Sequence, residues 1–148
     1  MIRIERASMA DLDELLGMVA SYRVFYGRDS DSDRERAYVA GHLQNGSSVI
    51  FLARDDRGDP VGFMQLFQTF STVRLGPSLI LEDMFVVPRA RRAGVASALL
   101  DRADEYAREI GAVGMSLETA TDNAAAQRAY ERAGWTRESQ FYKYNAPL

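Results

Sequence analysis

Apolar and polar positions alternate along the chain with two different periods, and the changes of period divide it into strands and helices. Residues 2–6 alternate in the way typical of a strand, and apolar residues at helical spacing predict a helix over about 9–25. A polar, turn-like stretch at 28–33 leads into a second predicted helix over 33–45, which Asn45-Gly46 ends.

The pattern in the middle of the chain predicts three strands followed by a helix. The turn residues 55–60 separate apolar strands at 48–54 and 61–70, which predicts a hairpin. Residues 79–87 form the most hydrophobic strand, and Pro88 ends it. The stretch 93–110 has one apolar and one charged face, which is typical of an amphipathic helix.

The last third predicts a strand at 113–119, a helix over about 122–133 and a closing strand at 141–144. The resulting order is β-α-α-β-β-β-α-β-α-β. Such an order indicates an α/β fold, with a mixed sheet and helices on both of its faces, instead of an alternating doubly wound sheet. The length of 148 residues predicts a single domain over residues 1–148.

Composition and charge exclude several classes of protein. The chain has no cysteine, so disulfides, thiolate metal sites and cysteine nucleophiles are excluded, and the single histidine, His42, excludes a site with several histidines. A formal net charge of −3 argues against nucleic acid and anionic membranes as partners and is compatible with a cationic small molecule. No apolar run reaches the ~18 residues that span a bilayer, and no secretory signal is apparent. We therefore expect a cytoplasmic protein without a metal site.

The first candidate motif is the transition from the apolar strand to the helix that follows it, Arg91-Arg92-Ala93-Gly94-Val95-Ala96. A helix start exposes unpaired N–H groups and a partial positive charge, and small residues allow a ligand to approach the backbone. Together with two arginines, these features favour a site for a pyrophosphate. An ordinary basic helix entry is the alternative.

The second motif is Asn123 and Tyr130, which share one face of a predicted helix with Ala126 between them. An amide could hold a polar linker, and a phenol with a pKa of ~10 could protonate a thiolate that leaves with a pKa of ~8.5. Considered alone, the pair is more typical of a helix cap and a half-buried core tyrosine.

The third motif is Glu82-Asp83 inside the apolar strand. Two acids in a central strand are costly unless they are paired or functional, and neighbouring residues in a strand face opposite sides. Burial would raise the pKa of a carboxyl group and suit it to work as a base. A structural salt bridge or a position at the end of the strand is the alternative.

Two of these motifs together resemble the GCN5-related N-acetyltransferase (GNAT) superfamily. Arg91-x-x-Gly94-x-Ala96 fits its acyl-CoA signature, and Asn123, Ala126, Tyr130 and Gly134-Trp135 fit its second block, with Trp in place of Phe. Arg92 and Ala96 stand where many members have Gly. Within the superfamily, the segments 61–63 and 81–86 are similar to those of diamine or polyamine acetyltransferases and of Hpa2-like acetyltransferases.

The resemblance implies that acetyl-CoA is the acyl donor. The backbone of the strand would hold its pantetheine arm and the helix start its pyrophosphate, with further contacts from the second block. The residues so implied are Met84, Phe85, Val86 and Val87, then Arg91, Arg92, Ala93, Gly94, Val95, Ala96 and Ser97, and finally Asn123 and Ala126.

The resemblance also implies the catalytic and acceptor residues. Tyr130 would protonate the departing sulfur, Glu82 would act as the base through water, and Asp83 would orient the amine or the bulge of the strand. Tyr22, Phe25 and Tyr26, with Glu82, would bind a small cationic amine such as a polyamine, a diamine or a lysine-like compound. Members of the superfamily are often homodimers. A protein lysine or N-terminal acetyltransferase and a non-catalytic acyl-CoA-binding module stay open as alternatives.

Overall fold

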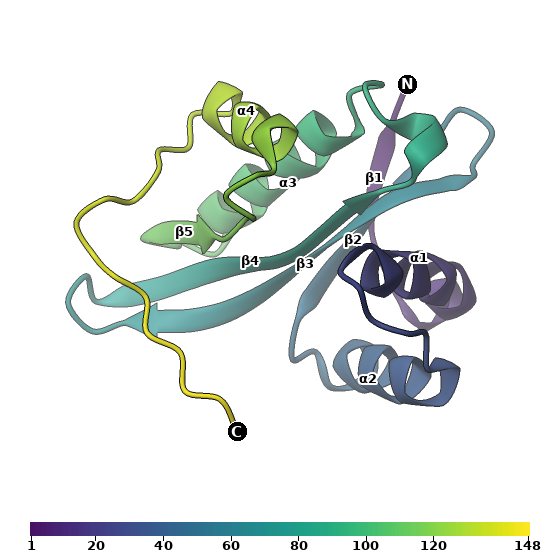
Figure 1. Cartoon of the computed structure of the whole chain (residues 1–148), viewed down its shortest axis with the longest axis horizontal. Coiled ribbons are helices and arrows are strands. Elements are labelled where there is room, and N and C mark those ends of the chain that lie inside the picture. The colour runs from purple at the N-terminus through teal and green to yellow at the C-terminus, as the bar shows by residue number, and fades with distance from the viewer. The chain divides into compact units, whose positions relative to one another are not determined.

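The computed structural model describes residues 1–148, which form two compact units, residues 1–118 and 119–148. The first unit contains one five-stranded sheet in which the strands follow their order in the chain (Figure 1). Strands β1 to β4 pair antiparallel, and β4 pairs parallel with β5. The strands are β1 Arg3–Arg6, β2 Val49–Arg54, β3 Pro60–Ser71, β4 Gly76–Val86 and β5 Gly114–Leu117.

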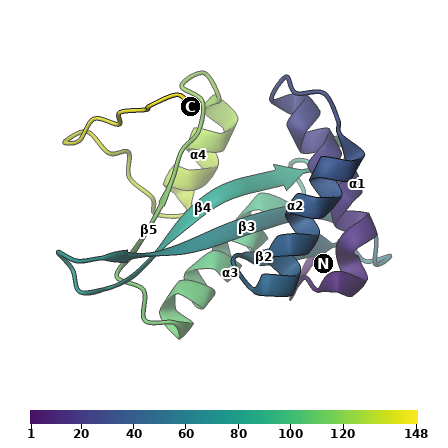
Figure 2. The same ribbon diagram turned by 90° about the horizontal axis from the view of Figure 1, so that it is seen from below.

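Three α-helices cover the two faces of this sheet. Helices α1 (Leu12–Phe25) and α2 (Ser32–Asn45) lie side by side on one face, and α3 (Val95–Glu109) lies on the other, as Figures 1 and 2 show. Short 3₁₀ turns, Met9–Asp11 and Pro88–Ala90, precede α1 and α3. No α-helix combines the length and the apolar character that a membrane-spanning helix requires.

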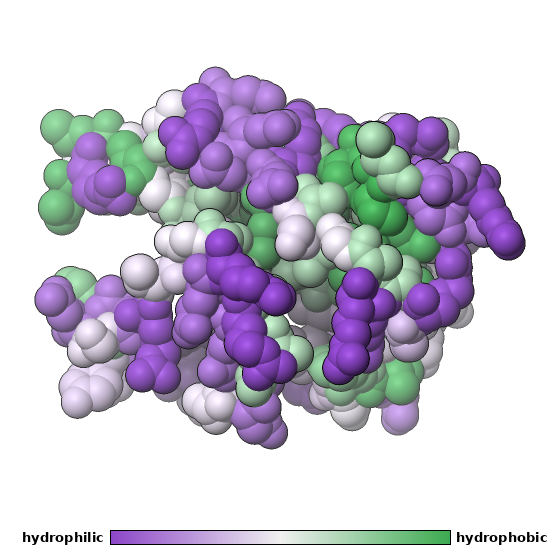
Figure 3. Space-filling model, turned by 90° about the horizontal axis from the view of Figure 1, so that it is seen from above, coloured by the Kyte–Doolittle hydropathy of each residue, from purple (hydrophilic) through white to green (hydrophobic).

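Hydrophobic burial explains why the helices dock where they do. One stripe of α3 is buried against the sheet, and its members recur at helical spacing: Val95, Leu99, Leu100, Ala103 and Ala107. On the other face, a cluster joins both helices to the middle strands: Leu12, Leu15, Met18, Val39, Ile50, Leu52, Phe63 and Phe85. Elsewhere hydrophilic side chains predominate on the surface that Figure 3 shows.

Strand β4 has two irregularities that matter for the site. Asp83 lies opposite Gln65 and Leu81 opposite Leu66, so Glu82 has no partner of its own in β3 and forms a β-bulge. Pairing with β5 covers only Ser78 to Leu81. The rest of β4, up to Val86, therefore has one open edge.

The second unit contains α4 (Ala124–Arg132), followed by a tail without regular secondary structure. The strand expected at 141–144 is wrong. A strand forms only where a neighbour accepts its backbone hydrogen bonds, and no strand pairs with this segment. Phe141, Tyr142 and Tyr144 are accordingly exposed. The other predicted elements are confirmed, with bounds that shift by a few residues.

Candidate active site

The start of α3 presents a row of backbone N–H groups. Gly94 caps the helix with φ of +82°, and Arg92 has φ of +64°, so the chain turns twice through the left-handed region before α3 begins. No backbone carbonyl accepts from the amides of residues 92–97. These free donors and the positive end of the helix dipole make the turn suitable for an anion.

The surroundings of this turn leave room for a ligand. A methyl group added at Gly94 would meet no atom within 4 Å. Arg91 and Arg92 are both exposed, but Arg91 is held by contacts: its Nε donates to the carbonyl of Val86 at 3.2 Å and its guanidinium lies 5.9 Å from the ring of Phe25. The arginine at 91 therefore links the turn to the end of β4 and to α1.

The open edge of β4 leads towards this turn. Residues 82–86 pair with β3 on one side only, because β5 ends its pairing at Leu81. The carbonyl of Val86 accepts from Arg91, and the other backbone groups on the free side are available to an extended ligand, as in strand addition to a sheet edge. Three of the four strand residues expected to bind the pantetheine arm, Met84, Phe85 and Val86, lie in this segment, and Val87 follows it.

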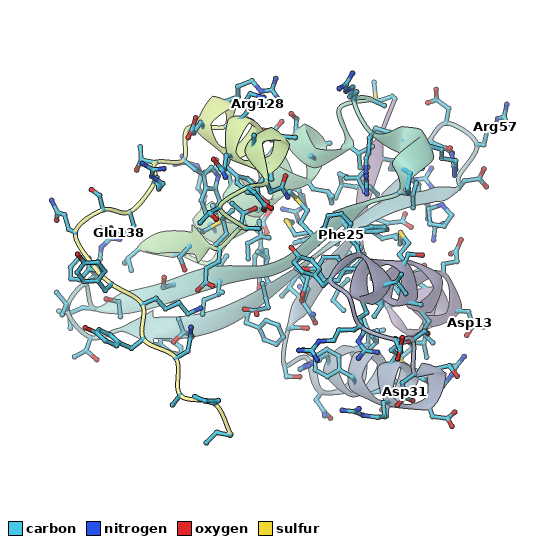
Figure 4. The ribbon with its side chains drawn as sticks, viewed as in Figure 1. Asp13, Phe25, Asp31, Arg57, Arg128 and Glu138 are labelled. Atoms are coloured by element: carbon cyan, nitrogen blue, oxygen red, sulfur yellow. The ribbon has the colours of Figure 1, made fainter.

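A cavity of about 520 Å³ opens between α1, α2 and the sheet. This size is typical of sites for small molecules. The ends of the two helices that border it, with Phe25 on α1 and Asp31 at the start of α2, are visible in Figure 4. Its apolar wall consists of Leu15, Val19, Ala37, Val39, Ile50 and Phe63. Its polar residues are Tyr22, Arg23, Arg34, Glu35, Tyr38, Gln65 and Asp83.

Asp83 is held in the cavity wall by a chain of hydrogen bonds. The buried Ser48 hydroxyl donates to Gln65 Oε1 at 2.7 Å, and Gln65 Nε2 donates to Asp83 Oδ2 at 2.7 Å. Burial raises the pKa of the Asp83 carboxyl, although the bonds from Gln65 and Tyr22 and the nearby His42 oppose the rise. The hydrogen bonds thus fix the orientation of the carboxylate, and burial destabilises its ionised form.

The charge of this carboxylate affects the pKa values of the two tyrosines that line the cavity. Burial, followed by the negative charge of Asp83, raises the pKa of Tyr22 well above its usual value. Burial also raises the pKa of Tyr38, and the charges of both Asp83 and Glu82 add to the effect. Both phenols therefore stay protonated at neutral pH. Although the two acids are neighbours in the strand, both act on the same tyrosine.

An ion pair joins the ends of α1 and α2 at the cavity. Arg23 donates to Glu35 at 2.7 Å and to the carbonyl of Asp29 at 2.9 Å. Glu35 is only 5% exposed and also accepts from the Ser30 hydroxyl and the backbone of Asp31. The hydrogen bond from Arg23 is the main reason that the pKa of Glu35 is lowered.

The aromatic residues expected to bind the acceptor form one chain of ring contacts. Tyr22 contacts Tyr26 at 5.0 Å between ring centroids, and Tyr26 contacts Phe25 at 5.3 Å. Tyr22 lines the cavity, whereas Phe25 and Tyr26 are more than half exposed and lie outside its lining. Glu82 is exposed at the bulge and does not line the cavity either.

The second unit holds the remaining expected residues. Asn123 is the N-cap of α4, where its side-chain oxygen accepts from the Ala126 backbone at 3.2 Å. The ring of Tyr130 lies 6.4 Å from that of Trp135. The cap is the structural role that the sequence left open for Asn123, and it leaves the amide nitrogen of that side chain for other contacts.

Five polar residues of the cavity were not predicted as site residues: Arg23, Arg34, Glu35, Tyr38 and Gln65. Gln65 carried a signal, because it is a polar residue inside the apolar strand 61–67 in the same way as Glu82 and Asp83 in theirs. Glu35 had none, since it is one charge among many in a polar stretch. No group of three or more His, Cys, Asp or Glu side chains is placed to hold a metal ion.

Comparisons with known proteins agree on one family. Residues 11–135 match the model of the acetyltransferase (GNAT) family. The uncharacterized N-acetyltransferase YhfO of Bacillus subtilis (strain 168) is 36% identical over 143 residues, which cover 97% of this chain and 95% of the relative. An aminoglycoside N(6')-acetyltransferase type 1 of Klebsiella aerogenes is 30% identical over 117 residues, with 75% and 74% covered. The crystal structure of a probable acetyltransferase superposes with a TM-score of 0.94 at 39% identity, covering 99% of this chain and 97% of that one.

Proposed function

Because the chain belongs to the acetyltransferase (GNAT) family and is an acyltransferase, we propose that it transfers an acetyl group from acetyl-CoA to the primary amine of a small molecule. The observation that carries the proposal is the cavity beside β4, with Asp83 in its wall. A half-buried carboxylate that is held by Gln65 is suited to bind an ammonium group.

The residues around the α3 start fit the donor. Amides 92–97 lack backbone acceptors, and Gly94 borders open space, so they can hold a diphosphate. The open edge of β4 at Met84, Phe85 and Val86, with Val87, can pair with the amides of a pantetheine arm. Asn123 and Ala126 complete the proposed binding set. Acetyl-CoA supplies the activated thioester.

The proton transfers fall to three residues of this chain. Glu82, exposed at the bulge, removes a proton from the ammonium group through water, since an alkylammonium with a pKa of ~10 has no lone pair at neutral pH. Asp83 orients the amine in the cavity. Tyr130 protonates the departing sulfur. Direct transfer needs no covalent intermediate, and correct positioning supplies much of the rate.

Several acceptor classes fit this chemistry. The sequence favours polyamines, diamines or lysine-like amines, and the relatives named aminoglycoside acetyltransferases add amino sugars. The aromatic groups of Tyr22, Phe25 and Tyr26 lie close to the cavity and suit a cation. We further propose a single domain that acts in the cytoplasm as a homodimer.

A screen of thiol release from acetyl-CoA tests the proposal. We expect turnover with at least one small amine among monoamines, polyamines, amino acids and aminoglycosides, and slower turnover with lysine peptides. Tyr130→Phe should lower kcat and leave acetyl-CoA affinity unchanged. Acetylation of peptides alone would favour a protein acetyltransferase, and coenzyme binding without turnover on any amine would favour a non-catalytic module.

A further inference from the structure

The charges that line the cavity add up to neutrality. Two arginines, Arg23 and Arg34, and two acids, Glu35 and Asp83, contribute to its wall. The remaining polar groups are the uncharged side chains of Tyr22, Tyr38 and Gln65. A site that binds a polycation needs several carboxylates that are free of other partners, and this balance does not provide them.

One acid of the cavity is already neutralised. Glu35 is buried and accepts from Arg23 at 2.7 Å, so the two charges cancel and neither is free for a ligand. Glu35 also accepts from the Ser30 hydroxyl and from the Asp31 backbone, which occupies its other lone pairs. Displacing Arg23 would leave a buried carboxylate without its partner.

Asp83 is consequently the one acid in the cavity wall without a cationic partner in contact. Its hydrogen-bond donors are neutral side chains, Gln65 and Tyr22. His42 acts on it electrostatically, and the exposed Glu82 lies outside the lining. Within the lining, Asp83 is therefore the one carboxylate free to pair with an ammonium group, and the charge of Glu82 reaches Tyr38 from outside the lining.

Arg34 adds a positive charge to the lining of the cavity. Its ion pair with Asp31 is long, 3.9 Å, and its side chain is 83% exposed, so the pair neutralises it little. Asp31 is also engaged as the N-cap of α2, because it accepts from the Arg34 backbone. The other wall of the cavity is apolar, with Leu15, Val19 and Ile50 among its members.

The geometry points to an acceptor that carries a single ammonium group on an apolar body, and it disfavours polyamines and aminoglycosides. This inference rests on the proposed function and narrows its acceptor class. The ammonium binds at Asp83, the apolar body lies against the aliphatic and aromatic wall, and the guanidinium of Arg34 repels a second cation.

A matched pair of probes tests this inference. Hexylamine and 1,6-diaminohexane have the same carbon chain and differ by one ammonium group. We expect kcat/KM for hexylamine to exceed that for the diamine by about tenfold. Isothermal titration calorimetry in the presence of CoA should give a similar ratio of dissociation constants, and it needs no turnover.

Two variants of α2 connect the ratio to Arg34. Arg34→Glu should lower the preference for hexylamine by about tenfold, because attraction replaces repulsion at that position. Arg36→Glu is the control, since Arg36 lies two residues away on the same helix, pairs with Asp13 at 2.8 Å and does not line the cavity. It should keep the ratio of the unchanged protein.

The inference is overturned if the unchanged protein binds the diamine as well as or better than hexylamine, if hexylamine shows no measurable binding, or if Arg34→Glu leaves the ratio unmoved. Failure of the proposed function gives a different result. In that case neither amine is acetylated, while the calorimetric ratio and its response to Arg34→Glu still support or refute the inference by themselves.

Discussion

Replacing Asp83 by asparagine separates binding of the acceptor from stability of the fold. Asp83→Asn removes the charge and keeps an oxygen that can accept from Gln65 Nε2, which now lies 2.7 Å from the carboxylate. The hydrogen-bond chain from Ser48 can therefore persist. What is lost is the negative charge that we propose as the partner of the ammonium group.

The expected loss of affinity follows from the strength of such contacts. A hydrogen bond to a charged group contributes about 1.5–3 kcal/mol, which corresponds to an increase in KM of about tenfold to a hundredfold for the best amine of the screen. The KM ratio of variant to unchanged protein should grow as the pH rises above the usual aspartate range, because burial raises the pKa of Asp83 and only the ionised form attracts the amine.

Asp83→Asn should weaken acceptor binding, but it should not lower the free energy of unfolding. A pKa that is raised in the folded state means that the folded chain holds the proton better than the unfolded chain. The stabilising contribution is present at low pH and is lost as the pH rises through the raised pKa. At neutral pH the ionised Asp83 therefore destabilises the folded state. Asp83→Asn should leave the urea midpoint unchanged or increase it.

Steady-state kinetics and urea unfolding measure the two effects. Asp101→Asn is the control, because Asp101 is an exposed acid on α3 outside the cavity, and it should change neither KM nor the midpoint. An unchanged KM in Asp83→Asn would refute the assigned role of this carboxylate. A marked decrease in the midpoint would refute the reasoning about its charge.

Three other changes test the packing, the ion pair and the helix start. Glu35→Gln should lower the free energy of unfolding by about 1–3 kcal/mol at neutral pH. Because Arg23 lowers the pKa of Glu35, the difference between the two proteins should vanish as the pH falls through that lowered pKa, which urea unfolding at several pH values will measure. Gly62→Ala puts a methyl group 2.8 Å from the carbonyl oxygen of Phe85 and should cost about 1–3 kcal/mol, which an unchanged thermal midpoint would contradict. Gly94→Glu should weaken CoA binding by more than about tenfold in calorimetry. Gly58→Glu is its control, because Gly58 has a similar φ of +83° in the turn between β2 and β3, and equal losses in both would refute the anion site.

The sequence predicts the elements whose periodicity is strong and whose partners are near. The amphipathic stretch that becomes α3 and the hairpin of β2 and β3 are examples, since local pattern and turn chemistry decide them. The strand expected at 141–144 has a suitable pattern, but strand formation depends on a pairing partner far away in the chain, and single-sequence pattern does not contain that information.

One part of the candidate site is built from neighbouring residues of the sequence, and the other part is built from distant segments. The turn around Gly94 is local, so the residues that build it follow one another in the sequence. The cavity is assembled from α1, α2, β3 and β4, and its hydrogen-bond chain joins Ser48, Gln65 and Asp83 across three strands or their ends. Partnerships of this kind depend on register, and the bulge at Glu82 changes the register at this very point.

The free side of β4 beyond Leu81 has a consequence for the folded protein as a whole. It is an incomplete sheet, and a molecule that pairs there contributes hydrogen bonds that the polypeptide does not make for itself. Any such molecule binds the native chain in preference to the denatured one, so its concentration sets part of the resistance to unfolding. With acetyl-CoA as the proposed occupant of this edge, the proposal predicts that its supply and the resistance of the enzyme to unfolding are coupled.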